Sequence, residues 1–215
     1  DQIVVGAPPA AHVMQTGIAS PILQALNVTA ASLANNHTND LGDIGLAETA
    51  RLLSDINVMP LVDGQVHDLG PVRIAAFSVL TTSDAPETTE RAIRAVETIC
   101  ETNAAPPLIV FVHWGEEYTR TSRPGERTLA SQFAACGASA VIGHHSHQAA
   151  RTVEAVRGGG GRMIYSLGNF MFDQRRDRAD GALAELRIFK QGTTALRLIP
   201  IPNLFETARE LAISD

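Results

Sequence analysis

The chain has 215 residues, of which 45% are hydrophobic and 19% charged, so it is long enough for one domain with a sizeable core and has an ordinary globular balance. Its formal net charge of −6, without a long basic run, argues against nucleic acid as the main partner. Two cysteines, Cys100 and Cys136, do not form a disulfide framework or a paired-cysteine zinc motif, so we expect two unpaired thiols.

Strand-like and helix-like runs alternate along the chain, which predicts a single layered α/β domain without repeats or linkers. The helix expected over 43–57 has an apolar stripe and Asp43 to cap its start. The helix expected over 124–136 has a proline in its first turn, and Gly137 suits its end. The expected helices span 18–26, 43–57, 87–100, 124–136 and 204–212. The expected strands span 28–33, 58–62, 72–80, 108–112, 138–142, 152–156, 163–167, 183–189 and 195–199.

No apolar stretch reaches the ~20 residues that a membrane span needs. The chain also opens without a basic-then-apolar signal segment. This favours a cytoplasmic location, whereas removal of a signal or an anchor would make the location extracellular.

Histidines gather directly after three of the expected strands. In open α/β sheets ligands bind outside the carboxyl ends of the strands, so these clusters are expected to converge on one crevice. Imidazole is also the commonest protein ligand for metals such as zinc, copper and iron. Five of the seven histidines lie in the clusters. The clusters are Asn36-His37, His113, and His144-His145 with His147.

Each cluster also has a purely structural interpretation. Asn36 and His37 can supply an amide ligand and a general acid, or they can form a capped turn before a helix. His113 can be a ligand or a hydrogen-bonded structural residue. The carboxylates of Glu116 and Glu117, which follow at once, can orient its ring or face water.

The third cluster favours the functional interpretation most strongly. If the segment is extended, His145 and His147 point to the same side, and His144 points away, toward packing or a supporting role. Three histidines in four residues after a buried strand are unusual for structure alone. Asn169 follows another expected strand, where it can add a hydrogen bond to the site or form a glycine-asparagine turn.

At these residues the sequence resembles the CapA family of bacterial capsule and poly-γ-glutamate synthesis proteins. The matching words are SLANNHTNDLGDIGL, FVHWGEEY, VIGHHSHQ and IYSLGNFMFD, over about residues 7–202. The resemblance implies a metallophosphatase-like β-sandwich flanked by helices, with a dinuclear centre of divalent Mn, Fe or Zn ions. It makes Asn36, His113, His145 and His147 metal ligands, and it makes His37 the catalytic histidine. We add Asp40 as its catalytic partner.

The sequence departs from the family pattern at its start. The family begins with a strand ending in Gly-Asp and a later Asn-x-Glu word, which supply acidic ligands, and neither word is found here. We therefore expect the domain to lack its N-terminal strand and helix. Unless that missing segment acts as a partner and supplies the acidic ligands, we expect one firmly held metal ion instead of two.

Three functions are compatible with these residues. The first is metal-dependent hydrolysis, most simply of a phosphoester, although no arginine clamp lies beside the motifs. The second is a peptide epimerase that abstracts a Cα proton, in the biosynthesis of modified peptides. The third is a non-catalytic accessory role that binds an anionic polymer such as poly-γ-glutamate. The expected substrate is accordingly a small molecule, a peptide or an anionic polymer.

Overall fold

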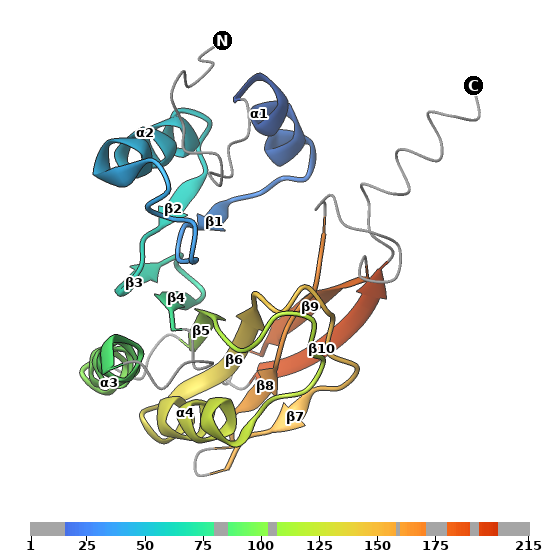
Figure 1. Ribbon diagram of the computed structural model, residues 1–215. Coiled ribbons are helices and arrows are strands. Elements are labelled where there is room, and N and C mark those ends of the chain that lie inside the picture. Colours follow the sequence, from blue (N-terminus) through green and yellow to red (C-terminus); the bar gives the residue numbers. More distant parts are fainter. Residues whose placement is uncertain are drawn as a thin grey trace.

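A computed structural model describes residues 16–79, 86–102, 107–157, 160–170, 180–189 and 194–201 (Figure 1). The helix expected over 204–212 lies outside the described residues. The other four expected helices are confirmed to within a few residues. They are α1 (Thr16–Ala25), α2 (Gly42–Asp55), α3 (Pro86–Cys100) and α4 (Pro124–Ala135). None of the described helices is long and apolar enough to cross a membrane.

A mixed six-stranded sheet forms the centre of the molecule. Its inner strands β4 (Arg73–Ser78), β5 (Leu108–His113), β6 (Ala138–His144) and β8 (Arg162–Ile164) are parallel. The edge strands β3 (Gln65–Asp68) and β7 (Glu154–Ala155) are antiparallel to their neighbours β4 and β8. We did not predict β3, because its four residues carry too weak an alternation to be recognised in the sequence.

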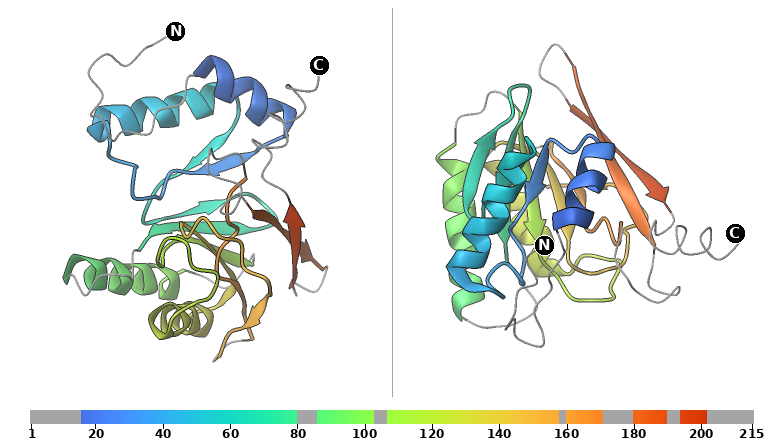
Figure 2. Two further views of the ribbon diagram at one scale, coloured as in Figure 1. Left: turned by 45° about the vertical axis from the view of Figure 1, so that its right-hand side comes forward. Right: turned by 90° about the horizontal axis from the view of Figure 1, so that it is seen from above.

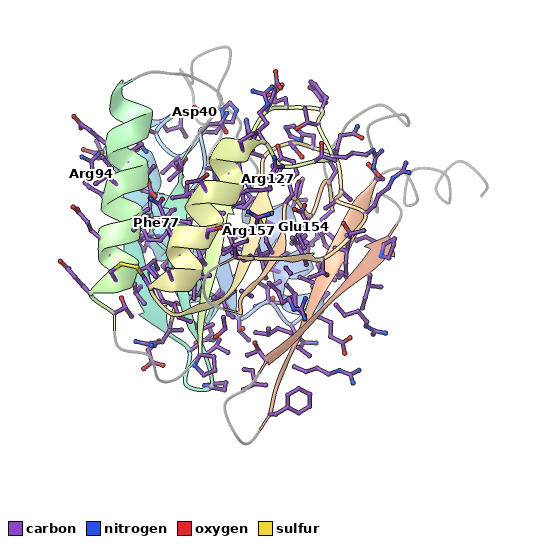
Figure 3. All side chains as sticks on the ribbon, turned by 90° about the horizontal axis from the view of Figure 1, so that it is seen from below. Asp40, Phe77, Arg94, Arg127, Glu154 and Arg157 are labelled. Carbon is purple, nitrogen blue, oxygen red and sulfur yellow. A yellow bond between two sulfur atoms is a disulfide. The ribbon has the colours of Figure 1, made fainter. Side chains whose placement is uncertain are left out.

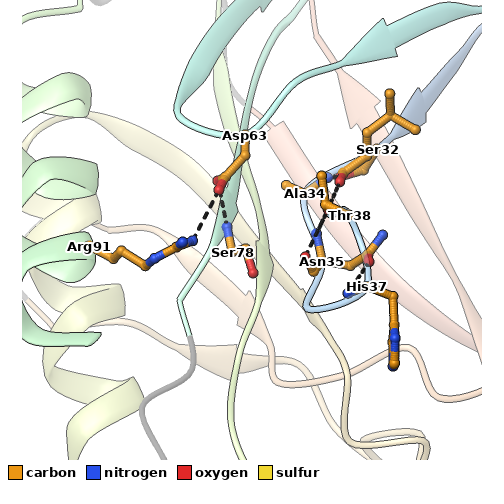
Figure 4. Close-up of polar contacts among 9 residues, drawn as sticks. Ser32, Ala34, Asn35, His37, Thr38, Asp63, Ser78 and Arg91 are labelled. Atoms are coloured by element: carbon orange, nitrogen blue, oxygen red, sulfur yellow. Dashed lines mark hydrogen bonds and ion pairs between the residues drawn. The ribbon is translucent and has the colours of Figure 1, made fainter. Parts of the chain in front are cut away.

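Two further pairs of strands lie outside this sheet. Strands β1 (Ala30–Ser32) and β2 (Met59–Leu61) pair in parallel. Strands β9 (Gly181–Ile188) and β10 (Thr194–Ile201) form an antiparallel pair, as expected for the end of the chain. Asp63, just after β2, accepts hydrogen bonds from the Ser78 backbone and from Arg91 of α3, which ties β2 to the central sheet (Figure 4).

The two faces of the central sheet are covered by different layers. On one face Phe77, Val110 and Val141 pack against Ile99 of α3 and Phe133 of α4. The opposite face meets the two outer strand pairs through two smaller clusters, which include Leu61 of β2 with Ala76, and Leu186 of β9 with Ile109 and Ile142. Figure 2 shows α1 and α2 at one end, α3 and α4 at the other, and the strands between them. This layered α/β arrangement confirms the expected fold class and is consistent with a metallophosphatase-like fold.

The expectation of two unpaired thiols is wrong. Cys100 at the end of α3 and Cys136 just after α4 form a disulfide, with their Cα atoms 4.6 Å apart (Figure 3). The two residues are 36 positions apart in the sequence. They meet because α3 and α4 lie side by side on the same sheet face, which helical periodicity alone does not reveal.

Candidate metal centre

The three histidine clusters line one cavity of about 940 Å³ at the carboxyl ends of β5 and β6. Parallel pairing sets His113 opposite His144, so both imidazoles start from the same edge of the sheet. The loop after β1 brings Asn36 and His37 to the same cavity, and the segment after β8 brings Asn169. The cavity is lined by all seven of these predicted residues: Asn36, His37, His113, His144, His145, His147 and Asn169.

His113 lies between two partners that determine where its proton sits. Its Nε2 is 3.0 Å from Asn36 Oδ1, and its Nδ1 is 2.8 Å from His144 Nδ1. An amide oxygen only accepts, so Nε2 of His113 carries the proton and Nδ1 accepts one from His144. In neutral His144 the other nitrogen, Nε2, then has no proton. It is buried and has no hydrogen-bond partner within the described part of the chain.

These imidazoles are held in the neutral form. Burial, followed by the neighbouring histidines, lowers the pKa of His113 to about 2. Burial, followed by His145, lowers the pKa of His144 to about 3. Burial also lowers the pKa of His145, while the charge of Glu117 opposes that change. A neutral imidazole is the form that binds a metal ion.

The expectation that His145 and His147 lie on an extended segment is wrong. Strand β6 ends at His144, and the two residues have φ angles of 103° and 58°. The backbone turns here, yet the ring centroids of His145 and His147 lie 6.3 Å apart, and those of His113 and His145 lie 4.5 Å apart. His147 Nδ1 is 2.9 Å from Asn169 Oδ1, which orients that ring.

His37 forms a pair with Asp40 in the turn between β1 and α2. Its Nδ1 is 2.9 Å from Asp40 Oδ2, and the two side chains are 41% and 20% exposed. The turn is held by the His37 N–H, which donates to Asn35 Oδ1 at 2.8 Å, and by the Asn35 N–H, which donates to Thr38 Oγ1 at 3.0 Å (Figure 4). The structural turn and the His37–Asp40 contact are thus present together, so the turn does not exclude the role of general acid that we predicted for His37.

The loop after β5 places two neighbouring carboxylates differently. Glu116 forms an ion pair with Arg123 and does not orient the His113 ring, although we had expected that it could. His144 and Asn36 hydrogen-bond to that ring instead. Glu117 lines the cavity. Tyr118 also lines it, and its ring stacks on His147 with centroids 5.9 Å apart. We gave Tyr118 no role from the sequence, although it ends one of the words that carry the resemblance.

The donor types fit a divalent metal ion, but they are not arranged around one point. Among the described residues no group of three or more His, Cys, Asp or Glu side chains stands ready to hold a metal ion. Instead, His113 hydrogen-bonds to both Asn36 and His144. Neutral imidazoles suit zinc and iron, and the amide oxygen suits manganese. Within the described residues, the buried Nε2 of His144 has no hydrogen-bond partner and is a further possible donor to a metal ion. Binding would therefore require these hydrogen bonds to rearrange.

Comparisons with known proteins identify the family of the chain. A family model described as "Bacterial capsule synthesis protein PGA_cap" matches residues 64–174. The "PGA biosynthesis protein CapA" of Bacillus subtilis (strain 168) is 30% identical over 202 residues, which cover 84% of this chain and 52% of that protein. The "Capsule biosynthesis protein CapA" of Bacillus anthracis is 27% identical over 198 residues, which cover 80% of this chain and 47% of that protein.

The chain thus spans about half the length of the curated relatives it matches. The family model covers more than half of the chain and includes His113, His144, His145, His147 and Asn169. Together with the layered fold, these matches show that the chain belongs to the bacterial capsule synthesis protein family PGA_cap, which includes the CapA proteins.

Proposed function

We propose that this chain carries the active site of a metal-dependent hydrolase that acts on a phosphoester or a related bond. The observation that supports the proposal is the meeting of two sets of residues in one cavity. The first set is the candidate metal ligands Asn36, His113, His145 and His147. The second is His37, which lines the cavity and pairs with Asp40 behind it, as in the acid–base pairs of many hydrolases.

A bound divalent metal ion would lower the pKa of a water molecule and neutralise charge on the group under attack. Asn36, His113, His145 and His147 would hold that ion, and Asn169 would keep the His147 ring in position. The hydrogen bond to Asp40 keeps the His37 proton on Nδ1, so Nε2 is the nitrogen that exchanges a proton with a substrate. The doubly protonated form of His37 would deliver its Nε2 proton to the leaving oxygen and keep its Nδ1 proton hydrogen-bonded to Asp40.

The experiment is a hydrolysis assay with an aryl phosphate monoester and diester, each with added Mn²⁺ or Zn²⁺. We expect turnover that a chelator abolishes and that added metal restores. A metal-loaded protein that releases neither phosphate nor the phenol from any ester would contradict the hydrolase proposal.

A second candidate, peptide epimerisation, is favoured by the lining of the cavity. Among the described lining residues there is no lysine or arginine to bind a phosphate. Apolar side chains instead form part of the wall, among them Phe111, Leu167 and Leu183. Such a wall suits a peptide that carries apolar side chains. Deuterium uptake from solvent into a peptide Cα would identify this reaction.

The names of the relatives point to a third outcome of the same assays. Both relatives are named for capsule or PGA biosynthesis, and a cavity with a bound cation can attract the carboxylates of an anionic polymer. Metal-dependent binding of poly-γ-glutamate without either reaction would therefore assign an accessory role to the site.

A further inference from the structure

Glu117 stands apart from the other acidic residues near the cavity. It is the only carboxylate among the described residues that line the cavity. Neighbouring carboxylates have basic partners, since Glu116 pairs with Arg123, Asp40 with His37 and Asp180 with Arg120. Glu117 has no ion pair or side-chain hydrogen bond within the described part of the chain, and its side chain is exposed.

The loop around Glu117 is held on both sides. The Tyr118 N–H donates to Ser146 O at 2.6 Å, and the Thr119 hydroxyl lies 2.9 Å from Tyr165 Oη. Gly115 begins the turn at φ +83°, where a Cβ atom would collide with the Tyr165 hydroxyl. Glu117 is therefore carried by a fixed loop at the cavity that His145 and His147 also line.

Glu117 brings a negative charge that the other candidate metal ligands lack. Asn36 is an amide, and the imidazoles of His113 and His145 carry no negative charge, so these candidate ligands would bring none to a divalent cation. A cation in a partly buried cavity needs a compensating charge, because transfer from water is costly for an ion without a counterion. Glu117 and His145 line the same cavity.

We infer that Glu117 is the carboxylate that binds the metal ion in this cavity together with the histidines that line it. The inference rests on the proposed function, because it concerns the same metal ion. It assigns to this chain an acidic group for the site, which the histidines and Asn36 do not provide. Glu116, one residue away in the same loop, is excluded from this role by its ion pair with Arg123.

The test is the affinity of the purified, metal-stripped chain for Mn²⁺, measured by isothermal titration calorimetry. Glu117→Gln removes the charge and keeps the shape, and we expect it to raise the Kd by about tenfold or more, the effect typical of groups that support metal sites. Glu116→Gln is the matched control, and its Kd is expected to stay within about twofold of the wild-type value. Both positions lie on an accessible loop, so neither change disturbs the core.

The outcomes separate the two proposals. If the wild-type chain binds Mn²⁺ and Glu117→Gln binds it equally well, the assignment of Glu117 is overturned while the metal site stands. The same holds if Glu116→Gln weakens binding as much as Glu117→Gln does. If the wild-type chain binds neither Mn²⁺ nor Zn²⁺, the proposed metal-dependent function fails, and the role of Glu117 fails with it.

Discussion

His144 and His145 are neighbours in the sequence, yet their imidazoles have different surroundings. His144 is the last residue of β6, stacks on Phe111 with ring centroids 4.7 Å apart, and hydrogen-bonds to His113. His145 leaves the strand with a positive φ, and its ring lies beside that of His113 at the cavity. His144 is therefore placed to orient His113, and His145 to bind a ligand.

We expect His145→Ala to lower the metal content of the purified protein more than His144→Ala does. The first change removes a candidate metal ligand. The second removes a residue that only orients the ligand His113, and the loss of such a residue typically weakens metal affinity by about 10–100-fold. Metal analysis of both variants after identical loading tests the order. Equal losses, or a larger loss in His144→Ala, would mean that the two roles have been exchanged.

We expect His37→Ala to keep its metal and to lose turnover by about 10²–10⁴-fold, the usual contribution of a positioned acid or base. His37 is half-exposed and pairs with Asp40, so its loss removes a proton carrier and leaves the other histidines in place. Steady-state kinetics and metal analysis on the same sample separate these effects. Loss of metal together with turnover would instead make His37 a ligand.

At the scale of the elements, the close approach of β6 and β8 determines the shape of the site. Leu167 N–H donates to Gly143 O at 3.0 Å, and Trp114 Nε1 donates to Tyr165 O at 2.9 Å. A Cβ atom on Gly143 would collide with both Tyr165 O and Trp114 Nε1. Only glycine at position 143 lets these elements meet directly before the histidine cluster.

We expect Gly143→Ala to lower the free energy of unfolding by about 3 kcal/mol or more, because neither a backbone carbonyl nor a buried indole can move aside easily. The control is Gly125→Ala in α4, where an added Cβ atom meets nothing within 4 Å. That change should be neutral or stabilising by about 0.4–1 kcal/mol. Urea denaturation followed by circular dichroism measures both, and similar midpoints for the two variants would refute the steric argument.

At the scale of the whole molecule, the cavity joins two parts that are distant in sequence. The hydrogen bond from His113 to Asn36 spans 77 positions and connects the central sheet with the β1–α2 loop. Helices α1 and α2 lie at the end of the molecule that carries this loop, with the β1–β2 pair between them and the central sheet (Figure 2). A ligand that binds Asn36 and the histidines together would hold these two parts against each other.

We therefore expect Mn²⁺ at about 100 times its Kd to stabilise the wild-type chain by about 2.7 kcal/mol, which raises the melting temperature by roughly 5–10 °C. Asn36→Ala should reduce this shift, because it removes the link from the β1–α2 loop. Differential scanning calorimetry with and without a chelator measures the shift, with Gly125→Ala as the control. A full shift in Asn36→Ala would exclude Asn36 from the ligand set.

The sequence by itself determined the described helices, most of the described strands and the edge of the sheet where the candidate site lies, but not strand β3. Apolar periodicity separates helices such as α2 from buried strands such as β5, because the two bury different repeats of residues. Histidines placed just after buried strands meet at one edge, because parallel strands share their carboxyl ends. Both inferences depend only on local pattern and on a general rule of sheet topology.

Only the tertiary structure decided which side chains pair with which. The Cys100–Cys136 disulfide, the turn at His145 and the different surroundings of Glu116 and Glu117 all depend on contacts between distant segments. Residue types and spacing do not encode such contacts, because helix packing and loop conformation are set by the balance of many weak interactions across the whole chain. The sequence names Asn36, His144 and Asn169 as members of the candidate site, whereas the imidazole that each of them contacts is defined by the fold.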